Sequence, residues 1–135
     1  MMNQIHPLRI LLADDSPAVR QALRWLLEDT SGFAVVGEAS DGETAVQLSQ
    51  DLLPDILILD IGLPHKNGFR VARLVKKQAP SVQIVILSGH GDATTRQLAA
   101  AVGVAGFVEK NEGWEALLAE IGRVIAQATN IVANC

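Results

Sequence analysis

The stretch Ile56–Pro64, with the sequence ILILDIGLP, decides the fold of this chain of 135 residues. Four consecutive apolar residues, Ile56 to Leu59, predict a β-strand that is buried on both faces, as in a parallel sheet covered by helices. Asp60 stands where this strand ends, and Gly62 and Pro64 then turn the chain away from the strand direction. The stretch therefore raises the question of why an apolar strand leads directly to a carboxylate.

Similar apolar runs recur along the chain and alternate with helical patterns. Besides Ile56–Leu59, the predicted strands are Leu8–Ala13, Phe33–Ala39, Val82–Leu87 and Gly106–Val108. The predicted helices follow the caps Ser16 and Asp41 and then span about 67–78, 93–102 and 112–128. Five strand–helix units with right-handed crossovers predict a flavodoxin-like doubly wound (βα)5 sandwich, with a five-stranded parallel sheet in the order 2-1-3-4-5.

Composition sets the bounds on organisation and location. Hydrophobic residues make up 49% of the chain and charged residues 19%, which suits one self-folding domain at 8–127 between tails at 1–7 and 128–135. A net charge of −4 without a Lys/Arg run argues against direct nucleic-acid binding. No apolar segment approaches the roughly 18–20 residues that span a bilayer. With Cys135 as its one cysteine, the protein is expected in the reducing cytoplasm.

Polar residues with related chemistry follow four of the predicted strands. Asp14 and Asp15 come after the first strand, and Asp60 comes after the third. Ser88 follows the fourth strand, and Lys110 lies just beyond the fifth. Because ligands of doubly wound sheets gather outside the carboxyl ends of the strands, these side chains are expected to meet at one edge.

Three carboxylates at one edge need a counter-charge. Each pair of neighbouring acids repels by roughly 1–4 kcal/mol at effective dielectric constants between about 80 and 20. A partly hydrated site of oxygen ligands suits Mg²⁺, for which Mn²⁺ can substitute, and Lys110 adds a further positive charge. A divalent ion, an ammonium and a hydroxyl beside a carboxylate form an environment for phosphoryl transfer to Asp60.

Four motifs together resemble the receiver domain of bacterial two-component response regulators. They are LLADDSPAVR at 11–20, ILILDIGLPHKNG at 56–68, VILSGH at 85–90 and GVAGFVEK at 103–110. The resemblance extends from about Leu8 to Ala126, nearly the whole chain. The segments SPAVRQALRWLLE and FAVVGEASDGETAV are similar to receivers of the nitrate-regulator type, which are attached to helix-turn-helix transcription factors.

This resemblance implies a role for each site residue. Asp60 would accept a phosphoryl group from a histidine kinase or phosphotransfer protein. Asp15, Asp60 and the backbone carbonyl of Gly62 would bind Mg²⁺, and Asp14 would act mostly through metal-bound water. Lys110 and Ser88 would hold the phosphoryl oxygens. Ser88 and Phe107 would act as the switch pair, with the aromatic ring following the movement of the hydroxyl.

The resemblance also implies a regulatory protein and not an enzyme in its own right. Its only catalysis would be its own phosphorylation and slow dephosphorylation. The output face would comprise the fourth helix, fifth strand and fifth helix, roughly Gly91–Ala101, Phe107 and Trp114–Ile121. Receivers commonly form homodimers or dock a partner there, and such a switch would control a partner or an output domain in transcription regulation.

Two positions near the site differ from the usual receiver pattern. Asn67 stands where an aspartate is frequent, at a turn position on the surface. Asn111 follows Lys110 where a proline is usual, commonly with a cis bond, so the pattern does not predict the geometry of this loop.

Other functions fit these residues less well. A phosphohydrolase of the haloacid-dehalogenase kind needs a second aspartate two residues after the nucleophile, where this chain has Gly62. A flavin carrier on the same sheet would lack a phosphate-binding loop after the first strand, where two acids would repel the phosphate. A helix-turn-helix would need about 60 further residues, so the chain is either a stand-alone receiver or part of a longer regulator. A binding module on the receiver fold that is not phosphorylated remains the alternative function.

Overall fold

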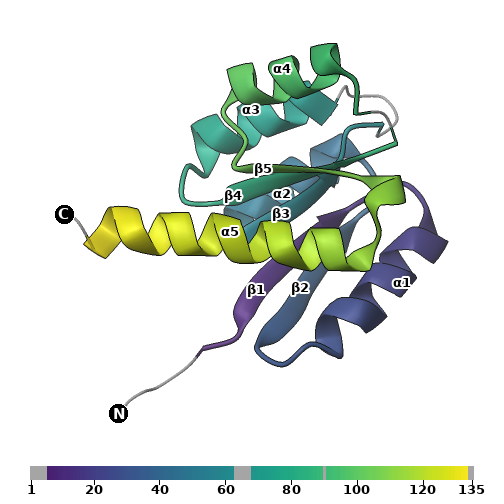
Figure 1. Cartoon of the computed structure of the whole chain (residues 1–135), viewed down its shortest axis with the longest axis vertical. Helices are drawn as coiled ribbons and strands as arrows, with labels where there is room; N and C mark the ends of the chain where they lie inside the picture. The colour runs from purple at the N-terminus through teal and green to yellow at the C-terminus, as the bar shows by residue number, and fades with distance from the viewer. Residues whose placement is uncertain (1–5, 63–67, 90, 134–135) are drawn as a thin grey trace.

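The computed structural model describes residues 6–62, 68–89 and 91–133, with side chains through residue 128 (Figure 1). The described strands are β1 (Leu8–Ala13), β2 (Phe33–Ala39), β3 (Ile56–Asp60), β4 (Gln83–Ser88) and β5 (Gly106–Glu109). The described helices are α1 (Pro17–Glu28), α2 (Gly42–Leu52), α3 (Gly68–Gln78), α4 (Ala93–Val102) and α5 (Trp114–Ala133). A short 3₁₀ helix, η1 (Lys110–Glu112), precedes α5.

The strands form one sheet in the order β2-β1-β3-β4-β5. Every adjacent pair in it is parallel, and β3 lies in the centre between β1 and β4. The predicted flavodoxin-like fold and its strand order are therefore confirmed. The carboxyl ends of all these strands point toward the same edge of the sheet, as the site requires.

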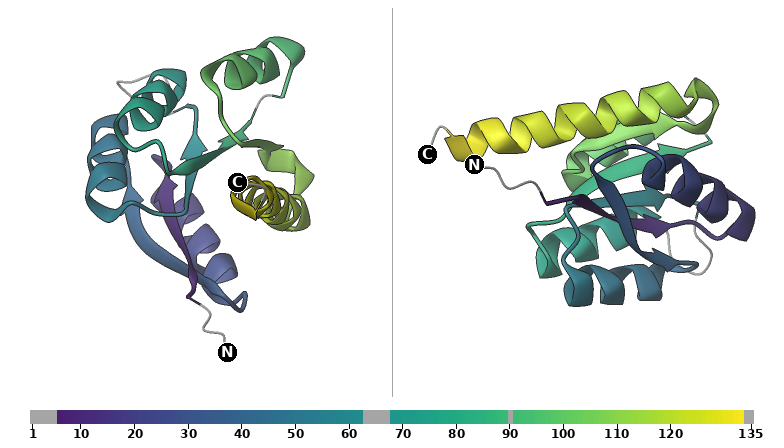
Figure 2. Two further views of the ribbon diagram at one scale, coloured as in Figure 1. Left: turned by 90° about the vertical axis from the view of Figure 1, so that its left-hand side faces the viewer. Right: turned by 90° about the horizontal axis from the view of Figure 1, so that it is seen from below.

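Helices cover both faces of the sheet (Figures 1 and 2). On one face, α2, α3 and α4 pack over a cluster that includes Leu57 and Leu59 of β3. On the other face, α1 and α5 pack over a cluster that includes Ile56 and Ile58. Because successive side chains of a strand point to opposite faces, the run ILIL supplies both cores at once.

Three predicted strands end one residue early. In the structure β3 includes Asp60, β4 includes Ser88 and β5 includes Glu109, and β4 begins at Gln83 instead of Val82. The pairing explains the extra residues, since Asp60 lies opposite Leu87 and Ser88 lies opposite Glu109 in the sheet. Asp60 and Ser88 are thus held by the sheet itself.

The last helix differs from its prediction at both ends. Gly113 has a φ of 95°, a left-handed value that separates η1 from α5, so the helix begins at Trp114 and not at Glu112. It continues to Ala133, beyond the predicted end near Ala128, so most of the segment assigned to a tail at 128–135 is helical. None of the helices described is both long and apolar enough to cross a membrane.

Helix capping follows the sequence closely at the first two helices. The Ser16 hydroxyl accepts a hydrogen bond from the Val19 N–H, and Pro17 occupies the first turn of α1. The Asp41 carboxylate caps α2 in the same way through the Thr44 N–H. Both predicted caps are confirmed, and the cap at Ser16 directs the chain away from the acidic pair at the end of β1.

An ion-paired glutamate fastens α1 to the sheet. Glu38 of β2 accepts from Arg24 Nε at 2.7 Å and from Arg20 Nε at 3.0 Å. The hydrogen bond from Arg24 holds the pKa of Glu38 below its usual value, and the bond and charge of Arg20 act in the same direction. A glutamate with a depressed pKa in the folded state stabilises the fold above its unfolded pKa, and this stability is lost as the pH falls through the folded value.

Replacing Glu38 with glutamine is therefore expected to destabilise the protein in a pH-dependent way. Near pH 7 the loss should be about 0.5–1 kcal/mol, because the three side chains are partly exposed and solvent screens them. The difference from wild type should shrink as the pH falls through the depressed pKa of Glu38, where its carboxylate becomes protonated. Urea unfolding at a series of pH values measures this difference in the free energy of unfolding, with Glu43→Gln on the exposed face of α2 as the control. A loss that is independent of pH would contradict the assignment.

Candidate functional site

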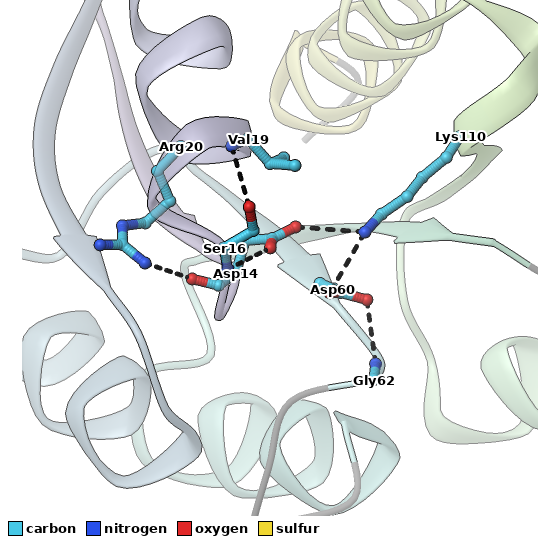
Figure 3. Close-up of polar contacts among 7 residues, drawn as sticks. All are labelled: Asp14, Ser16, Val19, Arg20, Asp60, Gly62 and Lys110. Carbon is cyan, nitrogen blue, oxygen red and sulfur yellow. Dashed lines mark hydrogen bonds and ion pairs between the residues drawn. The ribbon is translucent and has the colours of Figure 1, made fainter.

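The predicted site residues meet at the carboxyl edge of the sheet. Asp14 directly follows β1, and Asp60 is the last residue of β3. Lys110 follows β5 and reaches across to both acids, as Figure 3 shows. Ser88, the last residue of β4, is buried at the same edge. The ends of four strands thus bring side chains from distant parts of the sequence to one edge of the sheet.

The three aspartates form a single cluster of oxygen ligands. One carboxylate oxygen from each of Asp14, Asp15 and Asp60 lies within 4.8 Å of the others. Asp14 and Asp60 are buried, with 2% and 7% of their surface exposed, whereas Asp15 is exposed. Two buried carboxylates and one exposed carboxylate therefore lie close enough together to share one ion.

Lys110 balances part of this negative charge. Its Nζ lies 3.3 Å from Asp14 Oδ2 and 3.3 Å from Asp60 Oδ2 (Figure 3). Burial opposes the charged form of Lys110, but the neighbouring charges of Asp60 and Asp14 outweigh it and raise the pKa of the ammonium. The lysine is therefore charged at neutral pH and is placed to contact any oxygen bound beside Asp60.

The surroundings of Asp14 disfavour the charged form of its carboxyl group. Burial raises its pKa, and the charge of Asp60 adds to that effect. The Ser16 N–H, which donates to Asp14 Oδ1 at 2.9 Å, and the charge of Lys110 act in the opposite direction without cancelling the rise. Burial, with a smaller contribution from the charge of Asp60, therefore disfavours the ionised form of Asp14.

Two hydrogen bonds from backbone N–H groups, those of Gly62 and Gly68, fix the chain just after Asp60. The Gly62 N–H donates to Asp60 Oδ1 at 2.9 Å and orients the carboxylate. The Gly68 N–H donates to the Ile61 carbonyl at 3.2 Å, and a β-carbon at position 68 would lie 2.8 Å from that oxygen and overlap the Ile61 backbone. Only glycine fits there. Pro64 and Asn67, named above, lie outside the described residues.

The two residues predicted to form the switch lie on neighbouring strands. Ser88 of β4 is 1% exposed, and Phe107 of β5 is partly buried against the core that α2, α3 and α4 cover. The Phe107 N–H donates to Glu120 Oε2 of α5 at 2.9 Å. The guanidinium carbon of Arg96, on α4, lies 4.5 Å from the centre of the Phe107 ring. Their role as a switch stays a prediction.

The family model of the response regulator receiver domain matches residues 10–122 of this chain. The chain belongs to this family. The matched segment contains every residue of the site just described, and the order of the strands agrees with it. The resemblance inferred from four short motifs is thus confirmed at the level of the family. Members of the family are regulatory phospho-acceptors and not enzymes in the usual sense.

The curated relatives of this receiver domain are longer proteins with different names. The chain is 30% identical over 121 residues to the response regulator GacA of Pseudomonas aeruginosa, with 88% of this chain and 56% of GacA covered. It is 37% identical over 108 residues to protein-glutamate methylesterase/protein-glutamine glutaminase 5 of Myxococcus xanthus, with 80% and 30% covered. The chain thus spans about half the length of GacA and less of the methylesterase.

Solved structures of isolated receivers match over their whole length. The signal receiver domain of the NarL response regulator from Mycobacterium tuberculosis superimposes with a TM-score of 0.80 at 28% identity, covering 93% of this chain and 98% of that one. This likeness agrees with the nitrate-regulator type inferred from the sequence.

The receiver domain offers a set of ligands that fits a magnesium ion. Mg²⁺ prefers carboxylate and water oxygens and keeps part of its hydration shell. Asp14, Asp15 and Asp60 supply clustered oxygens, and the exposed position of Asp15 leaves room for water. The raised pKa of Asp14 fits too, because a bound cation would stabilise a carboxylate whose charged form burial disfavours. The Gly62 carbonyl as a further ligand stays a prediction, since the structure shows a contact of its N–H only.

Replacing Asp14 with asparagine is expected to stabilise the metal-free domain by about 1 kcal/mol, the energy of two unit charges about 4 Å apart in water. Asparagine keeps an oxygen for the Ser16 N–H and removes the cost of burying a charge together with the repulsion from Asp60, and these gains outweigh the lost attraction to Lys110. The same variant should lose most of the stabilisation that Mg²⁺ gives to the wild type. Thermal melting in EDTA and in Mg²⁺ measures both effects, with Asp51→Asn on the exposed face of α2 as the control. A lower melting temperature of Asp14→Asn in EDTA would contradict this account.

The sequence did not indicate the surroundings of Phe107. Arg96 and Glu109 lie in contact there, with Arg96 Nη2 donating to Glu109 Oε2 at 3.1 Å. They are 13 residues apart and belong to α4 and β5, so no local spacing rule connects them. The loop after Lys110, left open by the sequence, is the 3₁₀ helix η1, and the peptide bond between Lys110 and Asn111 is trans.

Proposed function

We propose that this receiver domain accepts a phosphoryl group on Asp60 from a phosphohistidine of a histidine kinase or phosphotransfer protein. The observation that carries the proposal is the placement of Lys110 Nζ 3.3 Å from both Asp14 and Asp60, inside a cluster of three acids. A purely structural ion pair would not need a third carboxylate. The cluster combines a nucleophile with groups that neutralise a phosphoryl group beside it.

In the proposed reaction a carboxylate oxygen of Asp60 attacks the phosphorus in line with the departing histidine nitrogen. A new O–P bond forms as the N–P bond breaks, and the imidazole nitrogen leaves with the electron pair. The Gly62 N–H holds the carboxylate in place, and Lys110 binds a phosphoryl oxygen as negative charge redistributes. Mg²⁺ held by Asp14, Asp15 and Asp60 would neutralise phosphoryl oxygens when bound.

Phosphorylation would then alter the charge at the edge of the sheet. A carboxylate becomes a group with a charge near −2, which favours new hydrogen bonds from Ser88 and Lys110. Ser88 lies opposite Glu109 of β5, the strand that carries Phe107, so a movement of Ser88 reaches the α4, β5 and α5 surface. We propose that this surface then binds a partner, a second copy of the domain, or an output domain that controls transcription.

Incubation with acetyl phosphate and Mg²⁺, followed by intact mass measurement, tests the proposed chemistry. One phosphoryl group is expected to be added per chain, and EDTA should suppress the addition because the three acids then lack their cation. The wild-type protein must show the melting transition of a folded domain in the same buffer. A folded protein that stays unmodified would instead support the alternative, a binding module on the receiver fold that is not phosphorylated.

A further inference from the structure

Arg96, on α4, contacts four residues, which lie in the loop before α4, in β5 and in η1. Its Nε donates to the Gly91 carbonyl at 3.2 Å, and its Nη2 donates to Glu109 Oε2 at 3.1 Å. Nη2 also lies 3.5 Å from Glu112 Oε1, and the guanidinium carbon lies 4.5 Å from the centre of the Phe107 ring. The planar guanidinium suits this combination, since it donates in a fork at its edge and packs over an aromatic ring with its face.

Glu109 fills the space beside Gly91. A β-carbon built at position 91 would overlap the carboxylate end of the Glu109 side chain. Glycine at position 91 therefore leaves room for the Glu109 side chain, which occupies this volume and contacts Arg96. Arg96, Glu109 and Gly91 together with the ring of Phe107 form a compact unit, which we call the Arg96 clamp.

The Arg96 clamp adjoins both groups that would bind the phosphoryl oxygens. Glu109 lies opposite Ser88 in the sheet and directly precedes Lys110. Gly91 lies three residues after Ser88 along the chain. A movement of Ser88 toward Asp60 would also displace Gly91 relative to β5, and the hydrogen bonds from Arg96 to Gly91 and Glu109 would oppose it.

We propose that Arg96 is a positioning residue that holds Gly91, Glu109 and Phe107 in the resting arrangement and thereby opposes phosphorylation of Asp60. This inference rests on the proposed function and adds a determinant of how readily the domain switches. The contacts of Arg96 would have to break or rearrange for the movement of Ser88 to occur, so they favour the arrangement in which Arg96 joins Gly91 to Glu109. A ligand that favours the other state must overcome them, which lowers its apparent affinity.

The expected size of the effect is modest. Arg96 and Glu109 are 44% and 29% exposed, so each ion pair taken alone is weak. Arg96 combines ion pairs to Glu109 and Glu112 with a backbone hydrogen bond and a cation–π contact. Its loss should raise the apparent affinity for a phosphoryl mimic by about threefold to tenfold.

Beryllium fluoride, a tetrahedral mimic of the phosphoryl group, serves as the probe in the presence of Mg²⁺. Trp114 lines a groove together with Lys110 and Leu87, so its fluorescence is a suitable readout of binding. Arg96→Ala is expected to bind the probe about threefold to tenfold more tightly than wild type. Arg96→Lys keeps the charge without the fork and should give an intermediate value. Arg73→Ala, an exposed arginine of α3, is the matched control and should bind as wild type does.

Gly91→Ala opens the clamp by a second route and leaves Arg96 intact. The new methyl group would displace the flexible end of Glu109 and break its ion pair, so this variant should also bind the probe more tightly. Combined with Arg96→Ala it should add little, because both changes break the same unit. This second variant keeps the test decisive if Arg96→Ala lowers the melting temperature of the domain.

The outcomes separate the two proposals. If wild-type protein shows no response to beryllium fluoride and no modification by acetyl phosphate, the proposed function fails. If wild type responds but Arg96→Ala and Gly91→Ala bind the probe as wild type does, or more weakly, the clamp is a structural contact only and the inference is wrong. Tighter binding in both variants, with the Arg73→Ala control unchanged, supports it.

Discussion

Replacing Asp60 with asparagine is expected to leave the chain unmodified after incubation with acetyl phosphate and Mg²⁺. The amide oxygen of asparagine is a poor nucleophile, whereas the carboxylate of Asp60 is held by the Gly62 N–H and faces Lys110. The substitution keeps the shape of the side chain and an acceptor for Gly62, so the fold should persist. Intact mass measurement under conditions that modify wild-type protein gives the answer directly.

The control for this prediction is Asp51→Asn, an equivalent change on the exposed surface of α2. The Gln47 side chain that donates to Asp51 Oδ1 at 2.9 Å can still donate to an asparagine oxygen. This variant should be modified as readily as wild type. Modification of Asp60→Asn to the same extent as wild type would show that another residue is the acceptor, and the proposed role of the cluster would then have to be abandoned.

Replacing Leu57 with alanine is expected to destabilise the domain by about 2–5 kcal/mol. Leu57 lies in the central strand β3 between Leu11 of β1 and Ile84 of β4, and it is fully buried. Its removal leaves a cavity under α2 and α3, which the sheet cannot close without breaking its own pairing. Domains of this kind have total stabilities of about 5–15 kcal/mol, so urea unfolding should show a large shift in midpoint.

Leu98→Ala is the matched control for the core substitution. Leu98 lies on α4 with 48% of its surface exposed, so the same loss of atoms should change the free energy of unfolding by less than about 1 kcal/mol. Equal losses for the two variants would mean that β3 does not form the centre of the core. The site should also be affected in Leu57→Ala, because Asp60 is carried by the same strand.

Much of the fold was predictable because each element has a local cause. The run ILIL is apolar on every residue, and only a strand covered on both faces can bury it. Ser16 and Asp41 start their helices through hydrogen bonds to nearby N–H groups, which depend on three-residue spacing alone. The cluster of acids followed from the same logic, since parallel strands bring their carboxyl ends to one edge.

What the sequence did not predict depends on contacts between distant elements. The Arg96 clamp joins α4 to β5, and neither segment shows a pattern that singles out its partner. The extent of α5 was missed because the residues after Ala128 continue a helix without a breaking residue before Ala133. The three strands that extend to Asp60, Ser88 and Glu109 were ended early because polar residues usually terminate apolar runs, whereas here the sheet continues through them.

The hydrogen bond from the Gly68 N–H to the Ile61 carbonyl limits which residues the domain tolerates near Asp60. A β-carbon at position 68 would overlap the Ile61 backbone, so any larger residue there must displace either α3 or the residue that follows Asp60. The same displacement would reach the Gly62 N–H, which orients the Asp60 carboxylate. The start of α3 and the geometry of that carboxylate are thus coupled through one small residue.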